Sequence, residues 1–127
     1  MSWSVNVQLA ATADAPAQAR AAVARTMGDD PRVEVAALAT SEVVTNAIVH
    51  GGVRDREAID LRIDQRADGV VRIEVGNRAG RPFAGVGAGE WQGPGQFGGW
   101  GLGIVRAISD AWGVDHADGR TLVWFVV

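Results

Sequence analysis

Glu42 is the only carboxylate or arginine between Val35 and Val53, a stretch rich in valine, alanine, leucine and isoleucine. At about 100° per residue, Glu42 shares one helical stripe with Asn46, four residues later, and His50 lies beside that stripe. The other members of the stripe are Val35, Leu38, Ala39 and Val49. Because these neighbours are apolar, we predict that the stripe faces inward.

A buried Glu42 and Asn46 at this spacing require polar partners, since burying an unpaired carboxylate costs several kcal/mol. A metal ion, a water molecule or a bound ligand would supply such partners. In the alternative interpretation, an arginine pairs with Glu42 and the backbone bonds Asn46, so that neither residue has a chemical role.

A second candidate site lies in the sequence FGGWGLGIVRAI, where glycines precede an apolar helix. Gly98, Gly99, Gly101 and Gly103 leave backbone N–H groups unobstructed at the positive end of that helix, which is a geometry that binds anions. The pattern is not a dinucleotide-binding fingerprint, because no strand directly precedes it and Arg106 stands where a small residue is needed. A flexible loop with a tight helix start is the alternative.

The composition excludes several classes of enzyme and partner. All 12 cationic side chains are arginines, so lysine-dependent phosphate loops and Schiff bases are unavailable, and the absence of cysteine excludes disulfides and thiolate metal sites. The net charge of −3, without an arginine cluster, argues against nucleic acid as a direct partner. The N-terminus lacks a signal sequence and no apolar run has the length of a membrane helix, so we expect a cytoplasmic protein without membrane contact.

The length of 127 residues, with 47% hydrophobic and 21% charged residues, predicts one globular domain over 1–127. Alternation predicts a strand over 3–9, a hairpin over 59–75 and a second hairpin over 114–127 whose last run, 122–127, is buried. Helices are predicted at 14–28, 30–50 and 101–112 from capping signals and apolar periodicity. We therefore expect an α+β two-layer sandwich, with a mixed, mostly antiparallel sheet and three helices on one face. We predict that the glycine-rich segment at about 82–100 is a functional lid.

Four motifs in order resemble those of the Bergerat-fold, histidine kinase-like ATPases. They are SEVVTNAIVHGG (41–52), VRIEVGNRAGRP (71–82), GWGLGIV (99–105), and AWG followed by GRTLVW (111–113 and 119–124). The short chain and its ending are most similar to the small anti-sigma factor serine kinases of Gram-positive bacteria, and the resemblance covers nearly the whole chain.

The resemblance implies roles for these residues. Glu42 would be the general base toward the attacking hydroxyl, and Asn46 would hold the Mg²⁺ that bridges the phosphates of ATP. Gly99, Gly101, Leu102 and Gly103 would bring the third helix to the phosphates. The remaining nucleotide-binding positions would be His50, Asn77, Gly80 and Thr121.

Two departures from the family pattern concern the nucleotide pocket. The first glycine box normally carries an aspartate that accepts the adenine amino hydrogen, and here the matching position is Asn77, which can accept that bond only without charge assistance. Between Arg81 and Arg106 the only ionised residue is Glu90, so the lid offers no cation to the γ-phosphate.

By this resemblance the chain is an ATP-dependent kinase that sequesters a sigma factor and phosphorylates a serine on an anti-anti-sigma antagonist. Related kinases pair as homodimers, for which the exposed first strand offers an edge. The alternative is a degenerate module that retains the fold and acts only by protein contact. A histidine kinase fragment ranks last, because a dimerisation and phosphoacceptor helix pair does not fit within this length.

Overall fold

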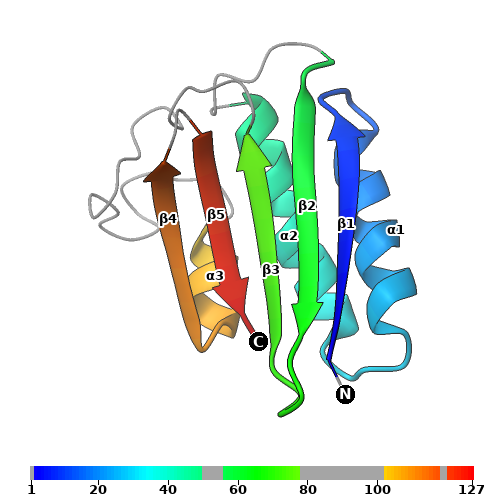
Figure 1. Ribbon diagram of the computed structural model, residues 1–127. Helices are drawn as coiled ribbons and strands as arrows, with labels where there is room; N and C mark the ends of the chain where they lie inside the picture. The colour runs from blue at the N-terminus through cyan, green and yellow to red at the C-terminus, as the bar shows by residue number, and fades with distance from the viewer. Residues whose placement is uncertain (1, 50–55, 78–101, 118–119) are drawn as a thin grey trace.

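The computed structural model describes residues 2–49, 56–77, 102–117 and 120–127, which form three helices and five strands (Figure 1). In chain order the elements are β1 (Trp3–Ala10), α1 (Ala15–Met27), α2 (Val33–Val49), β2 (Ala58–Gln65), β3 (Val71–Asn77), α3 (Leu102–Ile108), β4 (Ala111–Ala117) and β5 (Arg120–Val126). None of these helices is long and apolar enough to span a bilayer.

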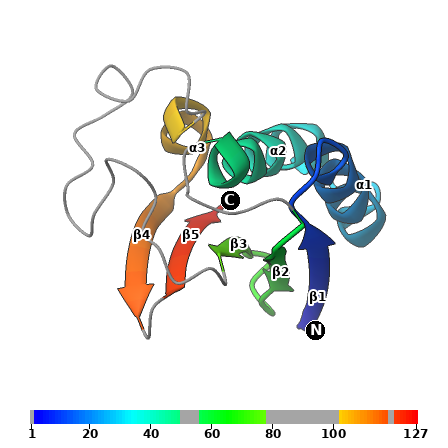
Figure 2. The ribbon, with the colours of Figure 1, turned by 90° about the horizontal axis from the view of Figure 1, so that it is seen from above.

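The five strands form one sheet in the order β1-β2-β3-β5-β4, and every pairing among the described strands is antiparallel. All three helices lie against one face of the sheet, and the other face carries no helical layer (Figure 2). The predicted α+β two-layer sandwich is therefore confirmed. Because each strand alternates its side chains between the two faces, the sheet has one helix-facing side and one open side.

Local sequence signals account for α1 and for the β2–β3 hairpin. Helix α1 carries Pro16 in its first turn and ends at Gly28, which adopts a φ of 59° and donates its N–H to the carbonyl of Ala24. The hairpin turns at Gly69 with a φ of 87°, a conformation that glycine adopts without a steric penalty.

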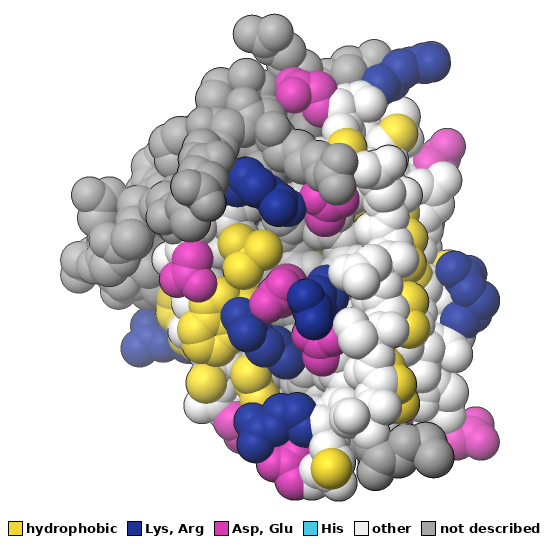
Figure 3. Space-filling model, viewed as in Figure 1, with side chains coloured by type: hydrophobic (Ala, Val, Ile, Leu, Met, Phe, Trp, Pro, Cys, Tyr) yellow, Lys and Arg dark blue, Asp and Glu magenta, His cyan; other side chains and the backbone are white. Residues whose placement is uncertain are grey.

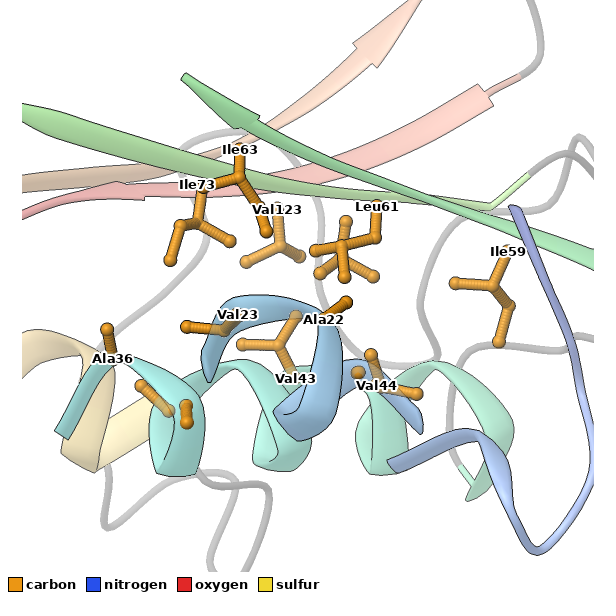
Figure 4. Packing of buried hydrophobic residues seen from close by; sticks show 14 of the residues in the cluster. Ala22, Val23, Ala36, Val43, Val44, Ile59, Leu61, Ile63, Ile73 and Val123 are labelled. Atoms are coloured by element: carbon orange, nitrogen blue, oxygen red, sulfur yellow. The ribbon is translucent and has the colours of Figure 1, made fainter. Parts of the chain in front are cut away.

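The core lies between the helices and the sheet, and the two layers contribute side chains of different size (Figure 4). The sheet supplies large aliphatic residues such as Ile59, Leu61 and Ile73, all fully buried, whereas α2 supplies Ala36, Ala39, Val43 and Ala47. Small side chains allow a helix to approach the sheet closely.

Helix α3 ends at Ile108, earlier than the predicted 101–112, and Trp112 belongs to β4. The N–H of Asp110 donates to the carbonyl of Val126 on β5, at 2.8 Å, which directs the chain into the sheet. Asp110 and Val126 are far apart in the sequence, so helical periodicity could not predict the bond between them.

The run 122–127 was predicted to be a buried strand, and this is correct for only one face of β5. Val123 and Phe125 are fully buried on the helix side, whereas Leu122, Trp124 and Val126 are half-buried on the open face. Figure 3 shows a hydrophobic patch on this face, over β4 and β5, beside charged side chains over β2 and β3. The guanidinium of Arg72 lies over the Trp124 ring, 4.8 Å from its centroid, and covers part of it.

Arg32 fixes the start of α2 to the sheet. Its guanidinium donates to the carbonyl oxygens of Gly69 and Val127, each at 2.9 Å, and to the carboxylate of Asp30. The hydrogen bonds from Arg32 lower the pKa of Asp30 from 3.8 to about 2. The Asp30 carboxylate therefore stabilises the fold above its ordinary pKa, and this contribution is lost as the pH falls toward 2.

We expect Asp30→Asn to lower the free energy of unfolding by about 1 kcal/mol at neutral pH, because the charge-assisted bonds to Arg32 are lost. The difference from wild type should shrink as the pH falls from 3.8 toward about 2, where the wild-type carboxyl also becomes neutral. Urea unfolding over this pH range measures both values. The control is Asp68→Asn, whose side chain is 50% exposed and should change little. A constant difference at every pH would contradict the assignment.

Candidate functional site

Helix α2 carries both residues that the sequence singled out, one turn apart. Asn46 is buried, with 3% of its surface exposed, whereas Glu42 is half-buried. The helix lies between α1 and α3 and contacts β3 (Figure 2). Asn46 is thus enclosed within the layer contacts, while the carboxylate of Glu42 remains accessible from outside.

The prediction that the whole Glu42 stripe faces inward is wrong. Val35, Leu38 and Val49 are 44%, 46% and 64% exposed, whereas Ala39 and Asn46 are buried, so the stripe runs along the border between the buried and the exposed face of the helix. The sheet already contributes large side chains, and the helix turns its small residues toward it instead. Size, rather than hydrophobicity alone, selects the buried face, and Glu42 lies at the rim.

Most polar side chains on α2 are satisfied by the backbone of the helix itself. Thr40 donates its hydroxyl to the carbonyl of Ala36, and Thr45 donates to Ser41, at 2.7 and 2.8 Å. Ser41 donates in the same way to the carbonyl of Leu38 at 2.8 Å. These bonds explain how hydroxyl side chains are tolerated within the buried face of α2.

The Asn46 side chain is the exception on α2. Its Nδ2 atom is buried and has no hydrogen-bond partner among the described residues. Leaving a buried amide donor unpaired costs about 1–3 kcal/mol. A group that is retained at this cost is a candidate contact for a ligand, and the carboxylate of Glu42 lies one turn away on the same helix.

Asn77 and Thr121, both predicted to contact the nucleotide, are direct cross-strand neighbours where β3 ends and β5 begins, in the interior of the sheet. Thr121 is 1% exposed and follows the same face as Val123 and Phe125, which is the helix-facing side. His116 of β4 stands opposite Thr121 in register. In backbone register, Asn77, Thr121 and His116 thus form a row across β3, β5 and β4, at the end of the sheet near the C-terminal end of α2 (Figure 1).

Helix α3 begins at Leu102 and includes Gly103, which is half-buried, and Val105, which is fully buried. It lies beside α2 (Figure 2). The other predicted positions, His50, Gly80, Gly99 and Gly101, and the predicted lid at 82–100 lie outside the described residues. The helix that carries Glu42 and Asn46 thus contacts both α3 and β3, and the Asn77–Thr121 pair lies where β3 ends.

The described residues hold no cluster of three or more histidines or carboxylates that could hold a metal ion by themselves. Mg²⁺ takes oxygen ligands, and it commonly uses one or two protein groups with the rest from phosphate and water. The Nδ2 of Asn46, which has no partner among the described residues, is a hydrogen-bond donor that suits an acceptor such as a phosphate oxygen and does not ligate a cation. The amide oxygen of Asn46 is of the ligand type that Mg²⁺ takes, and it is the group that would hold the ion.

We expect Asn46→Leu, of nearly the same shape, to raise the free energy of unfolding by about 1 kcal/mol, because the unpaired amide is removed. The matched variant Asn46→Asp should lower it at neutral pH, since it replaces the amide by an unpaired buried carboxylate. Urea unfolding without ligand measures both. If Asn46→Leu were less stable than wild type, the amide would have a structural partner and no reserved bonding capacity.

Comparison with known proteins identifies the family. The model of the histidine kinase-like ATPase domain matches residues 5–127. The chain is similar to a crystal structure of the RsbU and RsbW domains of Rv1364c from Mycobacterium tuberculosis, with 25% identity and a TM-score of 0.69. The alignment covers 98% of this chain and 32% of that one. None of the curated proteins searched matches the chain. The chain belongs to the histidine kinase-like ATPase domain family.

Proposed function

We propose that this protein is an ATP-dependent serine kinase of the anti-sigma factor class, which binds Mg-ATP through Asn46 and uses Glu42 as its general base. The observation that carries the proposal is the buried amide nitrogen of Asn46, which has no hydrogen-bond partner among the described residues and lies one turn from a half-buried glutamate, in a chain of this ATPase family. The proposal includes action in the cytoplasm and one catalytic domain over 1–127.

The two groups of residues suggest how the nucleotide would lie. The Asn77–Thr121 pair at the end of β3 and the start of β5 offers an amide and a hydroxyl, which suit the edge of an adenine ring. Asn46 and the glycine-rich approach to α3 would take the phosphates, together with His50, Gly80, Gly99 and Gly101. The amide of Asn77 is neutral, so we expect a weaker bond to adenine than an aspartate would make.

Asn46 would hold Mg²⁺ through its amide oxygen. When bound, the ion would neutralise negative charge on the phosphate oxygens, which matters in a chain without lysine. Asn46 is buried, so its side-chain amide is shielded from water on the side that faces the protein interior. No cationic side chain is assigned to this role within the described residues.

The half-buried position of Glu42 suits a general base. Its carboxylate would accept the proton of an incoming serine hydroxyl while the hydroxyl oxygen forms a bond to the γ-phosphorus. The bond between that phosphorus and the bridging oxygen breaks, and ADP leaves with the electron pair. Glu42 later releases its proton to water. Because its rim position is open to the outside, a serine on another protein can reach it.

The likeness to a structure that contains an RsbW domain and the sequence motifs both support a proposal for the partners. We propose that the protein sequesters a sigma factor and that its phosphate acceptor is an anti-anti-sigma antagonist. The neutral Asn77 favours a second candidate, a module that has lost catalysis and acts by protein contact alone.

We expect Glu42→Gln to reduce phosphoryl transfer from γ-labelled ATP by about 10²–10⁴-fold while nucleotide affinity is retained, because only the proton acceptor is lost. Asn46→Ala should instead abolish the Mg²⁺-dependent part of ATP binding. Calorimetry measures binding, and label transfer to a panel of antagonist proteins measures catalysis. The matched control is Glu34→Gln, an exposed glutamate in the first turn of the same helix.

Equal activity of wild type and Glu42→Gln would remove Glu42 as the base. If the wild type binds no ATP even at millimolar concentration, the kinase proposal fails and the contact module is favoured. If ATP binds but no antagonist accepts phosphate and no phosphate is released, the site binds nucleotide without catalysis, which also favours the module.

A further inference from the structure

A groove of about 420 Å³ lies between the start of α2 and the end of α3. Its lining consists of four apolar and two ionised residues, which are Pro31, Val35, Ile108 and Val127, and Arg32 and Asp110. The two helices lie side by side in the helical layer (Figure 2). Val35 comes eleven residues before Asn46, about 16 Å along the axis of α2, so the groove is separate from the candidate nucleotide site.

The apolar surface of the groove continues along the exposed side of α2. Among the described residues, the large hydrophobic side chains that are exposed all belong to this helix, and they are Val35, Leu38 and Val49. Val35 and Leu38 are one turn apart and form a ridge beside the groove. Val49 is fourteen residues from Val35, about 21 Å along the axis, and lies apart from this ridge. An exposed apolar ridge that adjoins a groove is typical of a protein contact site.

Asp110 gives the groove an excess of negative charge. The Arg32 guanidinium donates hydrogen bonds to both carboxylate oxygens of Asp30 and to two backbone carbonyls, so Asp30 already balances its charge. Asp110 is exposed at the groove. Arg106, the cation of α3, comes two residues before Ile108 and lies about 200° around the helix from it, on the other side. The groove therefore combines an apolar lining with a carboxylate that suits a cationic group.

We propose that this groove and its ridge bind an amphipathic helix of a partner protein, whose leucine-type side chains are flanked by lysine or arginine. A helix fits because side chains spaced three or four residues apart on two helices pack ridge into groove. The apolar side chains of the partner would fill the space between Val35 and Ile108 and cover Leu38. A cation beside them would meet the carboxylate of Asp110.

The described helices of a second copy do not have this chemistry. Helix α2 exposes large hydrophobic side chains but contains no cation, and α1 exposes Arg20 and Arg25 beside alanines only. Helix α3 carries Arg106, but its isoleucines are half-buried within the chain. None of these three helices combines an exposed large hydrophobic side chain with a neighbouring cation, so the helix that fits the groove belongs to a different protein.

Methyl NMR of the full chain tests the groove with a short, alanine-based helical peptide that carries two leucines one turn apart, flanked by lysines. This lysine peptide should shift the methyl signals of Val35, Leu38 and Ile108 and leave those of Val49 unchanged. A matched peptide with glutamates in place of the lysines should bind at least about tenfold more weakly, because Asp110 repels it. The difference between the two peptides should shrink as salt is added.

Two variants separate the apolar contact from the charged one. Val35→Gln should raise the dissociation constant of the lysine peptide at least about tenfold, because the groove loses apolar contact area. The matched control is Val49→Gln, the same change at a more exposed position of the same helix, which should bind as wild type does. Asp110→Lys should reverse the preference, so that the glutamate peptide binds more tightly than the lysine peptide. Circular dichroism melting of each variant verifies folding.

Unchanged signals of Val35 and Ile108 at millimolar lysine peptide would overturn the proposal. Equal affinities of the two peptides would overturn the role of Asp110, and equal shifts at Val49 would show that the peptide contacts any exposed apolar side chain of α2 and not the groove. If the same signals move when the protein alone is concentrated, the groove takes a second copy, which also contradicts the proposal. None of these measurements uses nucleotide, so the outcome is independent of the proposed kinase activity.

Discussion

The packing of the small-residue face of α2 against the large aliphatic side chains of the sheet is the contact on which the candidate site depends. Ala36, Ala39, Val43 and Ala47 let the helix approach β3 closely. The same approach buries Asn46, the next polar residue along this side, and leaves Glu42 at the rim. The core and the candidate site therefore share one helix. The distance between this helix and the sheet determines how accessible Glu42 and Asn46 are.

The polar residues of α2 that have a structural role differ from the functional candidate in whether their hydrogen bonds are satisfied within the helix. Thr40, Ser41 and Thr45 return their hydroxyls to the helix backbone, which satisfies them without any ligand. Asn46 has a buried nitrogen with no such partner. The helices of the described residues cover one face of the sheet, and an amide nitrogen without a partner among these residues is a considerable cost to the core between them. We interpret the amide as bonding capacity reserved for a ligand.

Much of the fold could be predicted from local pattern, because β1, α1 and the β2–β3 hairpin follow from alternation, Pro16, Gly28 and Gly69. The errors have physical causes. Helical periodicity places Glu42 and Leu38 on one stripe of α2. In a helix this rich in apolar residues, it does not determine which side of the helix contacts the sheet. The end of α3 depends on the bond from Asp110 to Val126, which no local signal contains. The register places Asn77 opposite Thr121, two of the predicted nucleotide-binding positions, and the roles of these two residues and of His50, Gly80, Gly99 and Gly101 stay predictions.

The most direct test of the central claim is the side-chain amide resonance of Asn46, followed by two-dimensional ¹⁵N NMR during titration with Mg²⁺ and a non-hydrolysable ATP analogue. The resonance is assigned by its loss in Asn46→Asp. If the unpaired amide is reserved for nucleotide, its two proton signals shift and saturate together with the binding isotherm. Nucleotide binding that leaves these signals unchanged would contradict the account, because the buried amide would then have no part in the site.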